Sequence, residues 1–116
     1  EPANPVPDSA NVVIFIHGLA LVSPHGYGAW INHLVKQGNI VIYPKYQDKD
    51  AQVPASEFNA NCVTGIVNAF DTLALPGHVK PRLDKVVIGG HSYGGLMCAN
   101  MAILAASVAY MIPRQG

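Results

Sequence analysis

One serine of this chain lies in a pattern that suits a catalytic nucleophile. Residues 90–94 read GHSYG and fit G-x-S-x-G, in which a serine occupies a strained turn between a strand and a helix and its hydroxyl projects above the sheet. The β-branched run at residues 86–88 precedes this segment, and an alanine-rich stretch follows it. The flanking sequence therefore predicts the required strand and helix, with Ser92 at positive φ in the turn between them.

The glycines of this segment are expected to have a mechanical role. A turn this tight brings the backbone two residues on either side of Ser92 close to the neighbouring strand and helix, so a Cβ at Gly90 or Gly94 would clash. Gly95 is expected to let the helix lie close to the sheet. His91 and the glycines on either side of it thus form the turn that supports Ser92.

Alternating strands and helices must position this serine. The first two strands are continuous apolar runs, as is typical of strands that are buried on both faces. The predicted strands are residues 12–16, 40–43 and 86–88, and the predicted helices are residues 27–36, 56–75 and 96–112. Gly38 is placed to end the first helix. This order predicts an α/β fold, a three-layer sandwich with a parallel sheet and right-handed crossovers.

Three segments of the chain resemble the N-terminal part of an α/β-hydrolase, the family of esterases, lipases and related serine hydrolases. They are the motif around Ser92, the sequence VVIFIHG at residues 12–18 and the sequence IVIYP at residues 40–44. The resemblance implies that residues 11–116 are the N-terminal part of one hydrolase domain, up to and including the nucleophile elbow, without its C-terminal strands and lid. Residues 1–10 are expected to form an extended arm, and residues 78–84 a link into the third strand.

The resemblance also implies where a substrate would bind. It places the second and third strands on opposite sides of the first, so the crevice lies at the carboxyl ends of the first and third strands. The His17-Gly18 turn and Ser92 both open onto this crevice. The backbone N–H groups of Leu19 and Tyr93 are then the predicted donors of an oxyanion hole.

A catalytic triad is incomplete in this sequence. The order in the family is serine, then an acid, then histidine, and no Asp, Glu or His follows Ser92. We therefore expect a fragment of a longer hydrolase, whose acid and base come from outside these residues. The five histidines are interpreted as structural or exposed, and His25 is the best candidate among them for a base: His17, His25, His33, His78 and His91.

Two hypotheses of function follow. The first is a serine hydrolase that acts on small-molecule carboxylic esters through an acyl-enzyme on Ser92. The alternative is a non-catalytic module with a hydrolase-like scaffold, which keeps a ligand crevice or a partner surface. In either case the strand at residues 86–88 has a free edge, so we expect the chain to self-associate or to bind the missing C-terminal part of the same protein.

Composition argues against other classes of function. Seven basic and seven acidic residues give a net charge of zero, and 12% of the residues are charged, so no basic patch for nucleic acid is expected. Asp48 and Asp50 have no third ligand in register, and neither a metal nor a cofactor is predicted. The apolar stretch at residues 96–112 approaches the ~18 residues of a membrane span, but its alanines favour a helix packed tightly beneath a sheet.

The cellular compartment stays open. Cys62 and Cys98 fall in two predicted helices, where free buried thiols are favoured, although helices on one face of a sheet could bring them together in a disulfide. The chain begins at Glu1 without Met and has three prolines among its first ten residues. This favours a mature or trimmed N-terminus and leaves secretion, with a signal peptide removed, as an option.

Overall fold

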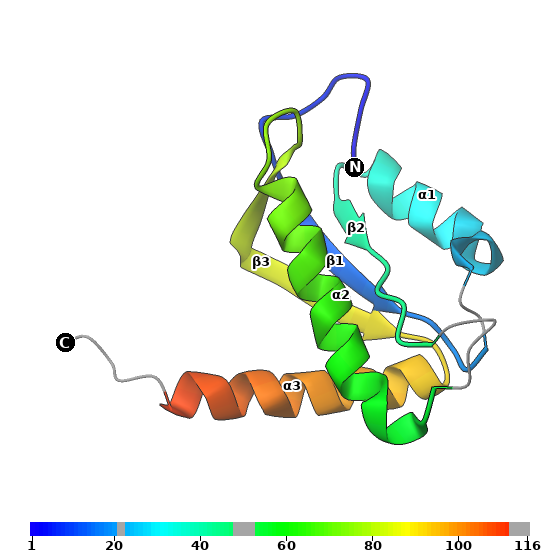
Figure 1. Cartoon of the computed structure of the whole chain (residues 1–116). Coiled ribbons are helices and arrows are strands. Elements are labelled where there is room, and N and C mark those ends of the chain that lie inside the picture. Colours follow the sequence, from blue (N-terminus) through cyan, green and yellow to red (C-terminus); the bar gives the residue numbers. More distant parts are fainter. Residues whose placement is uncertain (21–22, 48–52, 112–116) are drawn as a thin grey trace.

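A three-stranded parallel sheet with helices on both faces organises the chain. The computed structural model describes residues 1–20, 23–47 and 53–111, with side chains up to residue 103. Its elements are β1 (Ser9–Ile16), the 3₁₀ helix η1 (Pro24–Tyr27), α1 (Gly28–Lys36), β2 (Ile40–Ile42), the 3₁₀ helix η2 (Ala55–Glu57), α2 (Phe58–Leu73), β3 (Lys80–Gly90) and α3 (Tyr93–Met111). The strand order is β2-β1-β3 (Figure 1), which confirms the predicted α/β fold.

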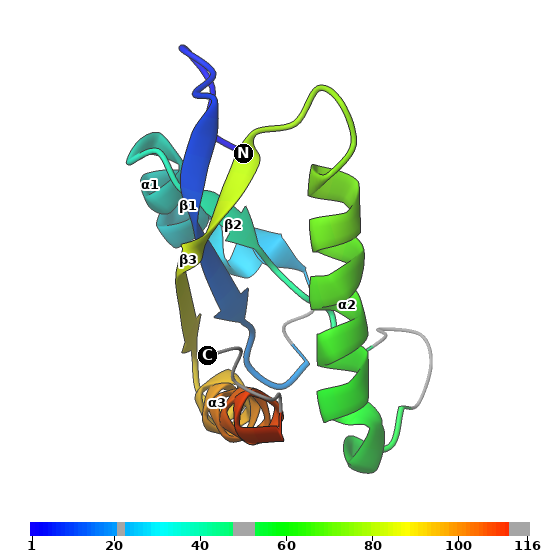
Figure 2. The ribbon, with the colours of Figure 1, turned by 90° about the vertical axis from the view of Figure 1, so that its left-hand side faces the viewer.

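Alternate residues of the central strand β1 face two different layers. Val12, Ile14 and Ile16 belong to the main core, which lies between the sheet and helices α2 and α3. Phe15 faces the other way, toward η1 and α1, where its ring lies 4.8 Å from that of Tyr27. Figure 2 shows α1 and α2 on opposite sides of the sheet. A strand covered on both faces has no polar side to display, which explains the unbroken apolar sequence of its residues 12–16.

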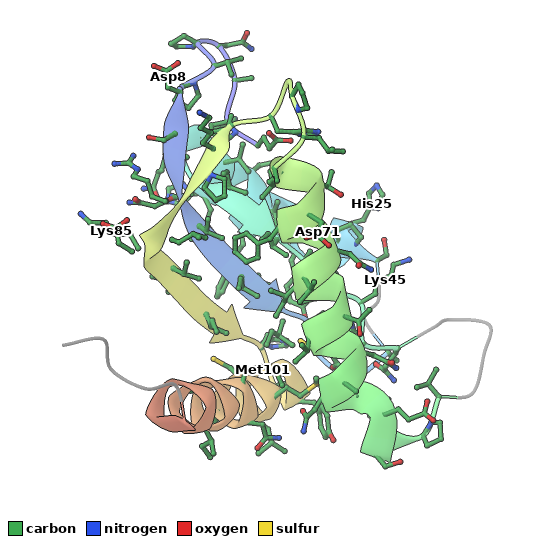
Figure 3. All side chains as sticks on the ribbon, turned by 60° about the vertical axis from the view of Figure 1, so that its left-hand side comes forward. Asp8, His25, Lys45, Asp71, Lys85 and Met101 are labelled. Atoms are coloured by element: carbon green, nitrogen blue, oxygen red, sulfur yellow. The ribbon has the colours of Figure 1, made fainter. Side chains whose placement is uncertain are left out.

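Helix α3 lies beneath the carboxyl ends of the strands. Met97 and Met101 are its buried core residues, and Met101 lies on the side of the helix that faces the sheet (Figure 3). Met adapts to irregular spaces, which suits a helix that enters the core directly from a tight turn. In the described part of the chain, no helix is long and apolar enough to cross a membrane.

Strand β3 is longer than the sequence predicted. It begins at Lys80, because Lys80, Pro81 and Arg82 pair with the start of β1. The register then shifts so that Val12 pairs with Val86, which leaves residues 83–85 as extra residues in β3. Lys85 projects outward at this bend (Figure 3). Proline and charged side chains in an exposed strand lack the apolar pattern, so the expectation of a link at residues 78–84 was wrong for residues 80–84.

The N-terminal residues are fastened to the connection between α2 and β3, directly before β3. The Glu1 carboxylate accepts a hydrogen bond from the Val79 N–H at 2.9 Å, and its other oxygen lies 2.7 Å from His78 Nδ1. The carbonyl of Asp8 accepts from the Lys80 N–H at 3.1 Å, and β1 begins at Ser9. The predicted arm at residues 1–10 therefore ends two residues early, because backbone pairing with β3 extends the strand.

Other element ends differ from the predictions by one to three residues, and the larger differences are the early starts of β1 at Ser9 and of α3 at Tyr93. The first helix begins at Gly28, because the preceding turn is 3₁₀ and is capped by Ser23. The second helix is likewise preceded by η2, and β2 ends at Ile42 rather than at residue 43. Gly38 has φ of 92° directly after α1, as predicted for a glycine that ends a helix. The turn at the start of a helix can have either 3₁₀ or α geometry, so a sequence pattern does not determine at which residue the α-helix begins.

The two thiols are unpaired, as favoured from the sequence. Cys62 is fully buried on α2, and burial raises the pKa of its thiol to about 11. Cys98, on α3, donates a hydrogen bond to the Ile88 carbonyl at 3.2 Å. Both side chains act as packing residues between the helices and the sheet.

Candidate active site

Ser92 stands on the turn that joins β3 to α3. β3 ends at Gly90 and α3 begins at Tyr93, and between them Ser92 has φ of 56° and is exposed. The positive φ confirms the predicted strained turn, since a serine rarely adopts this conformation unless its surroundings impose it. The turn is tied to the central strand, because the His91 N–H donates to the Ile16 carbonyl at 3.1 Å.

Two glycines make this turn sterically possible. A Cβ on Gly90 would lie 2.2 Å from the Gly94 carbonyl oxygen, and a Cβ on Gly94 would lie 2.0 Å from the Ile16 carbonyl oxygen. Both predicted clashes are therefore confirmed. Gly95 does not have the role expected of it, because its added Cβ would meet only the Gly90 oxygen, at an ordinary 3.6 Å. The close approach of α3 to the sheet is made at Gly94.

The turn after β1 presents a free amide at Leu19. The Gly18 N–H donates to the Tyr27 hydroxyl at 2.9 Å, and the Ala20 N–H donates to Gln47 Oε1 at 2.7 Å. The amide between them, Leu19 N–H, has no hydrogen-bond partner among the described residues. Side chains from two other segments thus hold both neighbours of this amide. Its own N–H is left available to an acceptor outside the protein.

A second free amide lies at the start of α3. The N–H of Tyr93 has no hydrogen-bond partner in the described part of the chain. As the first residue of a 19-residue helix, it also carries the partial positive charge of the helix N-terminus. The Tyr93 ring packs edge-on against Phe58 of α2, with centroids 5.8 Å apart, which fixes the first turn of α3.

His17 is a fully buried part of the Leu19 turn. Its Nδ1 lies 2.7 Å from the Gly18 carbonyl oxygen, and its ring stacks on that of Tyr46 with centroids 4.1 Å apart. The Tyr46 hydroxyl donates to the His17 carbonyl at 2.7 Å. The Nε2 atom of His17 has no hydrogen-bond partner within the described residues. Burial lowers the pKa of His17, the charge of Lys45 lowers it further, and the hydrogen bond to Gly18 opposes both.

This burial predicts a loss of stability in mild acid. The unfolded chain binds a proton at His17 below its ordinary pKa of 6.5, whereas the folded chain resists it. The free energy of unfolding should therefore fall as the pH drops below ~6.5, by at most ~1.4 kcal/mol per pH unit for one proton. Urea unfolding between pH 5 and 8 measures this slope. His17→Asn should reduce the slope, and His33→Gln, at an exposed position of α1, should leave it unchanged. Equal slopes in all three proteins would contradict the role of His17.

Three of the other histidines have partners away from Ser92, and His33 is exposed on α1. His25, the best candidate for a base, lies 3.0 Å from Ser23 Oγ in the cap of η1, and its side chain points outward (Figure 3). His78 binds Glu1, and His91 Nδ1 lies 3.0 Å from the Tyr27 hydroxyl. Among the described residues, no histidine hydrogen bonds to Ser92. Those residues also hold no group of three or more potential metal ligands, and Asp48 and Asp50 lie outside them.

Sequence reasoning missed three of the side chains that shape this site. Tyr27 was predicted as the first residue of a helix and, with Leu19, Leu21 and Tyr93, as part of an apolar entrance, but not as a hydrogen-bonding group. Leu21 lies outside the described residues. Tyr46 and Gln47 were predicted as part of a polar loop. The hydroxyl and amide groups of these three side chains, Tyr27, Tyr46 and Gln47, hold the turn on either side of Leu19 through contacts that span 9 to 29 residues. Tyr46 and Gln47 follow β2 within a few residues, and a position after a strand end is the signal that could have indicated these two.

The fold, together with a match to a known family, places the chain among the α/β-hydrolases. The model of the Chlorophyllase family, a family of that superfamily, matches residues 5–112. The chain therefore belongs to the Chlorophyllase family, which is a family of esterase-type hydrolases. Neither a curated protein nor a solved structure matches the chain. The resemblance to α/β-hydrolases is thus confirmed at the level of the superfamily.

Proposed function

We propose that this chain supplies the nucleophile and the oxyanion hole of a serine hydrolase that acts on carboxylic esters. The observation that carries the proposal is Ser92, exposed at positive φ on a strand-to-helix turn. The two free amides of Leu19 and Tyr93 support it, as does membership of an esterase-type family. The family is named for an activity on chlorophyll, and the substrate class proposed here is the wider one of carboxylic esters.

The proposed chemistry begins with attack by Ser92 Oγ on the ester carbonyl carbon. The carbonyl oxygen becomes an oxyanion, which accepts hydrogen bonds from the Leu19 and Tyr93 N–H groups at about 3 Å. The C–O bond to the alcohol then breaks, and the alcohol leaves with a proton. Water hydrolyses the acyl-enzyme by the same route and regenerates Ser92. Preorganised amides stabilise charge that exists only near the transition state, so they accelerate reaction without tightening substrate binding.

We propose that the general base and its acid come from another segment of the same protein. No Asp, Glu or His follows Ser92 in the sequence, and none of the described histidines hydrogen bonds to Ser92. β3 is the strand where such a segment would join, because it lies at an edge of the sheet and pairs only with β1 in the described structure. Additional strands there would bring their carboxyl ends beside Ser92.

Chemical rescue tests the nucleophile on residues 1–116 as they stand. A fluorophosphonate probe should react with Ser92 in the presence of imidazole, which takes the place of the missing base. The Oγ–P bond forms as the P–F bond breaks, fluoride leaves, and imidazole takes the serine proton. We expect the rate of labelling to rise with imidazole concentration, and intact mass and peptide mapping to place one adduct on Ser92.

Two alanine variants make the test specific. Ser92→Ala should abolish the imidazole-dependent adduct, while Ser23→Ala, at another exposed serine, should label like the unsubstituted protein. Labelling spread over several serines, or none above the imidazole-free rate, would contradict the proposal. That result would favour the alternative, a non-catalytic module with a hydrolase-like scaffold.

A further inference from the structure

Tyr27 joins the two turns that carry the free amides. Its hydroxyl oxygen lies 2.9 Å from the Gly18 nitrogen, one residue before Leu19. The same oxygen lies 3.0 Å from Nδ1 of His91, one residue before Ser92. These turns follow two different strands, and Gly18 and His91 lie 73 positions apart in the sequence. The backbone already joins them once, through the hydrogen bond from the His91 N–H to the Ile16 carbonyl. The Tyr27 hydroxyl is therefore a side-chain link between the turn after β1 and the turn after β3.

The hydrogen bonds of this hydroxyl are compatible with each other. The Gly18 N–H can only donate, so the Tyr27 oxygen accepts from it. The hydroxyl proton is then available to donate to Nδ1 of His91, when the His91 ring carries its own proton on Nε2. Both bonds of Tyr27 are thus satisfied by the two turns, with no requirement for a third group.

Packing holds the Tyr27 ring where its hydroxyl can make hydrogen bonds to both Gly18 and His91. The ring lies 4.8 Å from that of Phe15 and meets the His91 ring edge-on at 5.6 Å. The space around the hydroxyl is also filled, since a Cβ on Gly18 would lie 3.2 Å from the Tyr27 oxygen and 3.4 Å from His91 Nδ1. The bridge therefore fixes the distance between the turns rather than merely touching both.

We infer that Tyr27 is a positioning residue for the oxyanion hole, which holds the Leu19 amide in register with Ser92 and the Tyr93 amide. The inference rests on the proposed function of those groups. Loss of the bridge should slow the reaction of bound substrate with little effect on binding, because the amides act on the oxyanion and not on the ground state. Misplacement of reacting groups by about 1 Å costs on the order of 100-fold in rate.

Tyr27→Phe tests this role, with Tyr43→Phe as the matched control. Both remove one hydroxyl from the same group of aromatic rings, but the Tyr43 hydroxyl donates to the Ser23 carbonyl, and within the described residues it makes no hydrogen bond to Gly18 or His91. In the imidazole-rescued labelling of Ser92, Tyr27→Phe should lower the maximal rate about 10- to 100-fold and leave the probe concentration at half-maximal rate unchanged. Tyr43→Phe should stay within about twofold on both measures.

Variants of His91 test the other end of the bridge. His91→Asn keeps a hydrogen-bonding group near the place of Nδ1 and should retain most of the rate, whereas His91→Leu should match the loss in Tyr27→Phe. Combining His91→Leu with Tyr27→Phe should add little, since both remove one bridge. Equal maximal rates in Tyr27→Phe and Tyr43→Phe would overturn the inference.

Amide hydrogen exchange separates this inference from the proposed function. In Tyr27→Phe, the hydrogen-bonded amides of Gly18 and His91 should both exchange faster than in Tyr43→Phe, whether or not Ser92 reacts. If Ser92 is never labelled but exchange changes on both turns, the proposed function fails and the bridge stands. If exchange changes at Gly18 alone, the two turns are not coupled and the bridge is wrong.

Discussion

Replacement of Gly94 by alanine should disrupt the protein far more than the same replacement one residue later. An added Cβ at Gly94 would lie 2.0 Å from the Ile16 carbonyl oxygen and 2.6 Å from that of His17. All these atoms belong to backbone, so relief requires α3 to move away from the end of β1. We expect a loss of about 3 kcal/mol or more in the free energy of unfolding, measured by urea denaturation.

Gly95→Ala is the matched control for this prediction. Its Cβ would meet only the Gly90 oxygen at 3.6 Å, and alanine is favoured over glycine in a helix by about 1 kcal/mol. Gly95→Ala should therefore be neutral or slightly stabilising. Imidazole-rescued labelling of Ser92 should survive in this variant and be lost in Gly94→Ala, because the displaced helix carries the Tyr93 amide with it. Similar stabilities in the two variants would contradict the steric account of the turn.

The turn at Ser92 could be predicted from sequence because its constraints are local. Five consecutive residues determine that a strand must end and a helix begin, and the glycines leave few conformations that avoid a clash. The positive φ of Ser92 could be expected from these residues together with the strand and helix that flank them. The same holds for Gly38, whose φ is set by the end of one helix. Steric constraints between residues that are close in the sequence can be recognised from a short stretch of that sequence.

The surroundings of Leu19 could not be predicted in the same way. Its position after an apolar strand was readable, but the groups that hold its turn come from distant segments: the hydroxyl of Tyr27 and the amide of Gln47. A polar residue in a loop has many possible partners, and only the folded chain selects one. For the same reason the first part of β3 was missed, since backbone pairing with β1 overrides a sequence without apolar alternation.

The exposed surface of β3 bears on whether the isolated chain self-associates. Three apolar side chains of this strand are exposed, Leu83, Val86 and Val87, with 70%, 37% and 60% of their surface accessible. The strand is also at an edge of the sheet. Parallel sheets normally have both faces covered, and an exposed apolar edge strand is a template for pairing with another chain. We therefore expect β3 to be covered by another segment, and to associate where that segment is missing.

Purified residues 1–116 should accordingly self-associate through β3. Sedimentation velocity over a range of concentrations should show dimers or larger species. Val87→Lys should shift the population toward monomer, because a charged side chain on an edge strand opposes pairing. Val67→Lys is the matched control: Val67 is 51% exposed on α2, so the same change in charge and shape there should leave association unaltered. Equal effects of the two substitutions would mean that net charge, and not β3, governs association.

A strictly monomeric chain would contradict this account of β3.

The same preparation of residues 1–116 can be assayed for turnover of a short-chain aryl ester, with Ser92→Ala as the comparison. Without a base, an oxyanion hole and bound substrate together give only about 10³- to 10⁴-fold acceleration over water. We therefore expect slow, Ser92-dependent turnover that imidazole increases. Rapid turnover by a monomer without imidazole would mean that one of the five histidines of this chain serves as base. The outward-pointing His25 would then have to leave Ser23, and His25→Gln would abolish the activity.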